Sequence, residues 1–135
     1  MASVKKFSMG AVRNQLRHNE REIARSSNPD IDPERQYYDY KLSPDRGMTD
    51  YDYFLQRKSE LYCYGREDVK VMAGWIVTAP QDLAEDREPQ FFQAVYDFLS
   101  ERYGEENVVQ AIVHDDEGGQ PHLHFCFIPA VEDPK

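Results

Sequence analysis

Apolar residues recur along the chain at two spacings, one typical of helices and one typical of strands. In residues 11–25, apolar residues recur at the helical spacing along one side and arginines along the opposite side. In residues 88–103, aromatic residues recur at the same spacing. Thr49 followed by Asp52 has the form of an N-terminal capping pair, which predicts a further helix from Thr49 to residue 64. The glycine after residue 103 is placed to end the last helix. The pattern therefore predicts three helices.

Five segments have the β-branched and aromatic composition, or the alternation, of strands. They are residues 3–9, 36–42, 69–78, 107–114 and 122–129. A short connection separates the last two, which predicts a β-hairpin. Along the final segment His122, His124 and Cys126 alternate with large apolar residues, so the two sets point to opposite faces of a sheet. We expect one face to pack against helices and the other to present the histidines.

The predicted order is strand, helix, strand, helix, strand, helix, strand, strand. This order predicts an α+β fold, an antiparallel sheet with helices on one face. No repeat or Gly/Ser linker divides the 135 residues, a length that suits one domain and is too short for two ordinary ones. We therefore expect residues 1–135 to form a single domain.

Composition excludes several other classes of protein. With 40% hydrophobic and 30% charged residues, the chain can build a core and does not resemble a disordered protein. The longest apolar run, Val71–Val77, is far shorter than the ~20 residues that span a bilayer. The N-terminus lacks the apolar stretch of a signal peptide. Cys63 and Cys126 lack CxxC spacing and suit a reducing compartment, so we expect a cytoplasmic protein without a membrane segment.

Charge is distributed unevenly along the chain. The formal net charge is -9, but residues 1–26 carry six basic and two acidic side chains, a balance of +4. The remainder carries -13. Such an asymmetry indicates a localised anion-binding face on the N-terminal helix, although a solvated basic helix would have the same charges.

Three of the four histidines lie at one end of the predicted hairpin. His122 and His124 share a strand face, and His114 arrives from the neighbouring strand. Three imidazoles can satisfy part of the coordination of one divalent ion and leave positions open for water or substrate, as catalytic sites do. An exposed strand face would explain the His122 and His124 pair alone, but the convergence of three histidines favours a metal site.

The acidic residues beside the histidines leave several interpretations open. Asp115, Asp116 and Glu117 could be ligands, could orient an imidazole N–H, or could only form the turn. His114-x-Asp116 with a later histidine also has the form of the two-His-one-carboxylate triad of non-haem iron oxygenases. The three predicted helices argue against the double-sheet barrel that such oxygenases use.

The run from His114 to His124 resembles a known metal-binding motif, His-x-Asp-Glu followed by Pro-His-x-His. This motif belongs to relaxases of the MobV (Mob/Pre, plasmid recombination enzyme) family. His122-Leu123-His124 is also the His-hydrophobe-His pair of the wider class of single-strand DNA endonucleases. The N-terminal half is similar to the family's first motif, HNxR and then SNxDIDPxR, in His18–Arg21 and Ser27–Arg35. The resemblance covers nearly the whole chain.

The resemblance implies a relaxase-like fold and a strand-specific nicking and joining reaction at a plasmid transfer origin. His18 would be the nucleophile, holding the 5′ phosphate as a phosphoramidate, and Glu117 a second catalytic residue. An imidazole can attack near pH 7 because much of it is neutral there. The fold would bring the basic helix that carries His18 against the open face of the sheet. The residues implied to contact DNA and its phosphates are Asn19, Arg21, Arg25 and Arg35.

The implied cofactor is one divalent ion at His114, His122 and His124. Mn or Mg is expected from the family, and three imidazoles would also accept Zn, Co or Ni. The implied partner is single-stranded or supercoiled plasmid DNA at a transfer origin, with a homodimer or accessory proteins as further partners.

Two features depart from the family pattern. Three residues separate Glu117 from Pro121, where the pattern has two. The chain ends eleven residues after His124, whereas relaxase domains of the family continue, so we expect a relaxase-like nuclease domain shortened at its C-terminus.

Two other functions remain open from the sequence. One is a non-catalytic DNA-binding relative or autoregulator, which would keep the sheet and the basic helix but would not nick DNA. The other is a replication initiator or transposase with a tyrosine nucleophile. Its candidates are Tyr37, Tyr38, Tyr40, Tyr51 and Tyr53, which could equally be half-buried structural residues or base-stacking platforms.

Overall fold

The computed structural model describes residues 2–20, 40–61, 70–114 and 121–129. In chain order, the elements are β1 (Ala2–Ser8), α1 (Met9–Asn19), β2 (Tyr40–Lys41), α2 (Asp50–Ser59), β3 (Lys70–Thr78), η3 (Glu85–Arg87), α3 (Glu88–Tyr103), η4 (Glu105–Asn107), β4 (Val108–His114) and β5 (His122–Phe127). The order of strands and helices agrees with the sequence prediction. Residues 21–25 of the first predicted helix and 36–39 of the second predicted strand lie outside the described residues.

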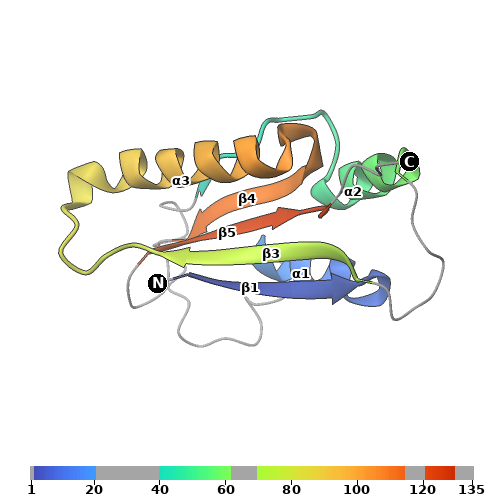
Figure 1. The fold of residues 1–135 in the computed structure, drawn as a ribbon, viewed down its shortest axis with the longest axis horizontal. Helices are drawn as coiled ribbons and strands as arrows, with labels where there is room; N and C mark the ends of the chain where they lie inside the picture. Colours follow the sequence, from blue (N-terminus) through green and yellow to red (C-terminus); the bar gives the residue numbers. More distant parts are fainter. Residues whose placement is uncertain (1, 21–39, 62–69, 115–120, 130–135) are drawn as a thin grey trace.

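The five strands form one antiparallel sheet in the order β1-β3-β5-β4-β2 (Figure 1). The pairing of β4 with β5 confirms the predicted hairpin. Strand β5, the last of the described strands, lies at the centre of the sheet and pairs with β3 on one side and β4 on the other. Its backbone is therefore held along both edges, which makes β5 a rigid support for the side chains it carries.

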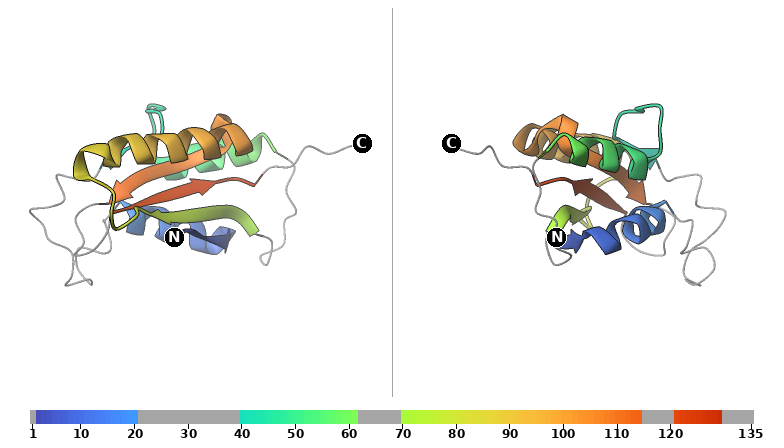
Figure 2. Two further views of the ribbon diagram at one scale, coloured as in Figure 1. Left: turned by 60° about the vertical axis from the view of Figure 1, so that its left-hand side comes forward. Right: turned by 90° about the vertical axis from the view of Figure 1, so that its right-hand side faces the viewer.

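Helices cover both faces of this sheet, with α3 on one side and α1 on the other (Figure 2). Phe92 and Leu99 of α3 pack on the face that carries Leu123, Phe125 and Phe127. On the opposite face, one apolar cluster joins α1, α2 and the sheet through Val12, Leu16, Phe54, Met72 and Cys126. The α+β class is confirmed, but the expectation that all helices lie on one face was wrong.

The reason lies in the composition of the face that presents the histidines. Near one end of the sheet this face carries apolar side chains, among them Met72, Val109 and Cys126. Burying such side chains requires a second layer, which α1 provides. The histidines lie farther along the same face, so α1 comes to rest beside them.

Local signals in the sequence correspond closely to the helix ends. The Thr49 hydroxyl accepts a hydrogen bond from the Asp52 backbone N–H at 3.0 Å, which confirms the capping pair. Gly104 ends α3 with a φ of 92°, a value that favours glycine, and its N–H donates to the Ser100 carbonyl at 2.8 Å. Within the described part of the chain, each helix is too short or too polar to cross a membrane.

Candidate active site

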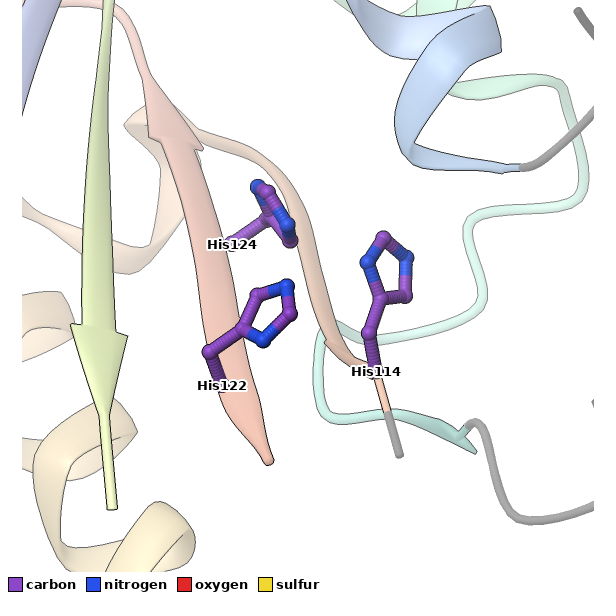
Figure 3. Close-up of side chains that lie close together, drawn as sticks. All are labelled: His114, His122 and His124. Atoms are coloured by element: carbon purple, nitrogen blue, oxygen red, sulfur yellow. The ribbon is translucent and has the colours of Figure 1, made fainter. Parts of the chain in front are cut away.

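Strands β4 and β5 bring His114, His122 and His124 together on one face of the sheet, as the sequence predicted (Figure 3). His114 and His122 are direct partners in the strand register. The ring centroid of His124 lies 4.5 Å from that of His114 and 4.9 Å from that of His122. One ligand nitrogen from each ring lies within 4.8 Å of the others. The three imidazoles thus form a compact histidine cluster.

The donor set of the histidine cluster fits a divalent metal ion. Two nitrogens bound to one ion at about 2.1 Å lie about 3 to 4 Å apart, so small ring rotations would close the cluster on an ion. His114 is 1% and His124 9% exposed, whereas His122 is half-buried. The cluster therefore has a buried side, which holds the rings, and an accessible side, from which water or substrate can approach.

The backbone of α1 orients His114. The Nε2 atom of His114 contacts the carbonyl oxygen of Asn19, the last residue of α1. A carbonyl oxygen can only accept a hydrogen bond, so Nε2 carries the proton and a neutral ring leaves its Nδ1 lone pair available to a metal. A carbonyl contact of this kind is how proteins commonly set the tautomer of a metal-binding histidine.

His18, the predicted nucleophile, is exposed on α1 and opens onto a cavity of about 170 Å³. His124 of the histidine cluster lines the same cavity, together with residues of β1 and β3. Gly74 keeps this space open, because a Cβ at its position would lie 3.2 Å from the Phe7 ring. The expectation that the basic helix lies against the histidine face is confirmed, and we name this space the His18 cavity.

A larger hollow lies on the other face of the sheet, between α3 and strands β1 and β3. Its volume is about 570 Å³, and its walls are largely apolar, with Trp75, Val77, Phe91 and Phe98 among them. Arg102 is the one cation among the lining residues, and none of them is a histidine, cysteine or carboxylate that would hold a metal ion. We therefore place the candidate site at the smaller His18 cavity, beside the histidine cluster.

Asn19 lines the His18 cavity, but it is almost wholly buried. Its side chain is 1% exposed and donates hydrogen bonds to the side-chain oxygen Oε1 of Gln110 at 2.9 Å and to the Cys126 sulfur at 3.4 Å. Asn19 is buried because it ends α1 on the side that faces the sheet. Its predicted contact with phosphate stays a prediction.

The other predicted residues of the site lie outside the described residues. They are the catalytic candidate Glu117 and the phosphate-contact candidates Arg21, Arg25 and Arg35. The same holds for Asp115 and Asp116 of the connecting turn and for Tyr37 and Tyr38.

The described tyrosines that were candidate nucleophiles have other positions. Tyr40 packs against the apolar cluster on the α3 side of the sheet. Tyr51 packs against the cluster of α1 and α2, and the Tyr53 hydroxyl donates to the Glu106 carbonyl at 2.7 Å. None of these three lines the His18 cavity. Their positions favour His18 over a described tyrosine as the nucleophile.

Two residues of the site were missed from the sequence. Lys5 of β1 lines the His18 cavity and brings a positive charge to it. Gln110 of β4 is completely buried beside α1. Gln110 had one available signal, since it is the one strongly polar residue within the apolar run Val108–Val113. Lys5 had only its place in the basic segment 1–26, because its position relative to His18 depends on how β1 and α1 pack.

Comparisons with known proteins agree with this geometry. The plasmid recombination enzyme (Mob/Pre) family model matches residues 1–135. A plasmid recombination enzyme of Streptococcus agalactiae is 31% identical over 138 residues, which is 96% of this chain and 28% of the relative. A plasmid recombination enzyme type 2 of Staphylococcus aureus is 32% identical over 134 residues, 93% of this chain and 31% of the relative. The chain thus spans about a third of the length of these relatives.

Solved structures of a relaxase domain show the same fold. The MobM relaxase domain, Mn-bound and in complex with oriT DNA of plasmid pMV158, matches all of this chain with a TM-score of 0.82 and 31% identity. The match covers 72% of that domain. A second Mn-bound complex matches with a TM-score of 0.80 and 30% identity. With the match to the family model over its whole length, the chain belongs to the plasmid recombination enzyme (Mob/Pre) family.

Proposed function

We propose that this chain is a relaxase domain that nicks and rejoins one strand of plasmid DNA at a transfer origin, with His18 as the nucleophile. The observation that carries the proposal is that His18 and His124 of the histidine cluster line one cavity. A nucleophile and a metal site must both reach one phosphate, and this cavity lies between them. Family membership and the oriT complexes of the MobM domain support the proposal.

His114, His122 and His124 would hold one divalent ion, Mn or Mg, which supplies Lewis-acid stabilisation to the scissile phosphate when bound. A nitrogen of His18 attacks the phosphorus, so that a P–N bond forms and the bond to the 3′ oxygen breaks. His18 loses a proton in this step, and the 3′ oxygen gains one. Joining is the reverse reaction, with a 3′ hydroxyl displacing His18.

Cations beside His18 would hold the phosphate during attack. Lys5 lines the His18 cavity, whereas Arg13 and Arg17 of α1 line a different cavity beside α2. We propose the same role for Arg21, Arg25 and Arg35, and a catalytic role for Glu117. A site of action in the cytoplasm, where plasmid DNA is accessible, is part of this proposal.

The test is to incubate the protein with Mn²⁺ and either supercoiled plasmid or labelled single strands that span its transfer origin. We expect a covalent protein–DNA product that is stable to denaturant but lost in mild acid, because a P–N bond is acid-labile. His18→Ala should abolish this product and leave Mn²⁺ binding unchanged. Tyr40→Phe serves as the matched control and should form it normally.

Other outcomes would assign a different function. A DNA-linked peptide that contains a tyrosine, or an adduct that survives His18→Ala, would place the protein with the tyrosine-dependent enzymes. Origin binding without any adduct would support the non-catalytic DNA-binding relative.

A further inference from the structure

Gln110 is a buried carboxamide in the strand that carries His114. It is 0% exposed and lies on β4 four residues before His114, so both side chains point to the same face of the sheet. A buried amide must find hydrogen-bond partners inside the protein. Gln110 finds them on the helices that cover this face.

Its hydrogen bonds join three elements. The Gln110 Nε2 group donates to the Leu16 carbonyl of α1 at 3.2 Å and to the Asp50 carboxylate of α2 at 2.8 Å. The Gln110 Oε1 atom accepts from the Asn19 side chain at 2.9 Å. Asp50 in turn pairs with Lys41 of β2 at 3.0 Å. Gln110 is therefore the point at which the last turn of α1 is tied to β4 and α2.

Strand β4 makes a second contact with Asn19, through His114. The Asn19 side chain binds Gln110, and its backbone carbonyl contacts Nε2 of His114. Strand β4 thus contacts one residue of α1 at two points, through side chains four residues apart. His18 directly precedes Asn19, so its backbone cannot shift along the sheet unless at least one of these contacts breaks.

We propose that Gln110 is a positioning residue, which with Asn19 sets the distance between His18 and the histidine cluster. The inference rests on the proposed function, in which His18 attacks a phosphate held at this cluster. Attack requires the reacting groups to be aligned, and a misplacement of ~1 Å can lower a rate ~100-fold. Gln110 itself does not line the His18 cavity, so its effect on the reaction passes through Asn19.

The test compares Gln110→Met with a matched control, Asn107→Ala. Methionine keeps the approximate size of the side chain and removes its hydrogen bonds. Asn107 is also a buried amide, 5% exposed, but it binds Arg57 and the Tyr103 carbonyl at the end of β4 remote from His114. We expect adduct formation in a single turnover to slow at least ~10-fold in Gln110→Met, with DNA affinity changed less than ~2-fold. Asn107→Ala, at a temperature where it is folded, should react at the wild-type rate.

A second readout uses the metal-free protein and needs no activity. Nitrogen NMR of the imidazoles at alkaline pH should show His114 as the Nε2–H tautomer in the wild type, and a mixture of tautomers in Gln110→Met. A wild-type adduct rate or an unchanged His114 tautomer in this variant would overturn the inference. If the wild type forms no adduct, the proposed function fails, and the tautomer still tests the role of Gln110. Should Gln110→Met not fold, Asn19→Ser removes the same link and is expected to give both effects.

Discussion

The imidazoles of His122 and His18 differ in their surroundings, although both are accessible from solvent. His122 lies within the histidine cluster, and His18 lies across a cavity from it. We expect His122→Ala to weaken Mn²⁺ binding more than ~10-fold, because it removes one of three ligands. His18→Ala should bind Mn²⁺ like the wild type. Isothermal titration calorimetry or Mn²⁺ electron paramagnetic resonance would measure both.

Thermal unfolding provides the control for this prediction. His122 points away from the apolar cluster under α3, so His122→Ala should unfold at nearly the wild-type temperature. Equal loss of Mn²⁺ affinity in His122→Ala and His18→Ala would contradict a site made of the three hairpin histidines.

Because the Cys126 thiol is buried, we expect the protein to become less stable at alkaline pH. Burial raises the pKa of this thiol to about 12, and the hydrogen bond from Asn19 offsets this in part. In the unfolded chain a thiol ionises near a pKa of about 8.5. The folded state therefore keeps a proton that the unfolded state loses, so the contribution is complete below pH ~8.5 and falls as the pH rises toward 12.

Cys126→Ala should remove this contribution. Between pH 9 and 10.5 its unfolding free energy should fall with a slope smaller by roughly one bound proton than that of the wild type. Urea unfolding at several pH values would measure the slopes. Tyr96, whose pKa burial also raises to about 12, acts in both proteins and cancels. Equal slopes would show that the Cys126 thiol ionises in the folded protein.

At the scale of elements, α3 separates its phenylalanines into buried and exposed ones. Phe92 is 0% exposed within the apolar cluster, whereas Phe98 is 64% exposed. Phe92→Ala should lower the unfolding free energy by about 3 to 5 kcal/mol, because it removes a buried ring and leaves a cavity. Phe98→Ala on the same helix should change it by about 0.5 kcal/mol or less. Urea denaturation measures both, and equal losses would contradict the packing of α3.

The arrangement of the sheet also predicts that such changes on its α3 face leave the histidine cluster in place. Alternation along β5 sends Phe125 toward α3 and His124 toward α1. A loss of packing under α3 therefore removes stability without removing a metal ligand. One face of β5 contributes to the apolar core, and the other face contributes two histidines of the histidine cluster.

At the scale of the whole molecule, the charge distribution predicts how DNA binding depends on salt. Residues 1–26 carry a balance of +4 within a chain of net charge -9. Only about three to five phosphates can then be neutralised, so the slope of log affinity against log salt should be about -2 to -4 for a single strand. Arg21→Ala removes one contact and should reduce the magnitude of this slope by about 0.7. Fluorescence anisotropy over a salt series would measure it.

Arg102 provides the matched control for the salt series. It is an exposed arginine on α3, across the sheet from the histidine cluster, and Arg102→Ala should leave the slope unchanged. If Arg102→Ala lowers the slope and Arg21→Ala does not, DNA binds on the α3 face.

The sequence by itself determined the features that depend on residues close to one another in the chain. The period of apolar residues predicted α3, Thr49 and Asp52 predicted the start of α2, and alternation along β5 predicted that His122 and His124 share a face. Each of these rests on residues a few positions apart, where helix and strand geometry set the relative direction of side chains. The motif residues also lie at short spacings in the sequence, so they could be matched to a family without the structure.

Only the tertiary structure decided which distant residues meet. Nothing local distinguishes Asn19, a polar residue at a helix end, from an exposed one, yet packing buries it against Gln110. The placement of α1 on the histidine face brings His18 and His124 to one cavity, and it also places helices on both faces of the sheet. These contacts join segments far apart in the chain, and they arise from the shared burial of apolar side chains, which has no fixed spacing in sequence.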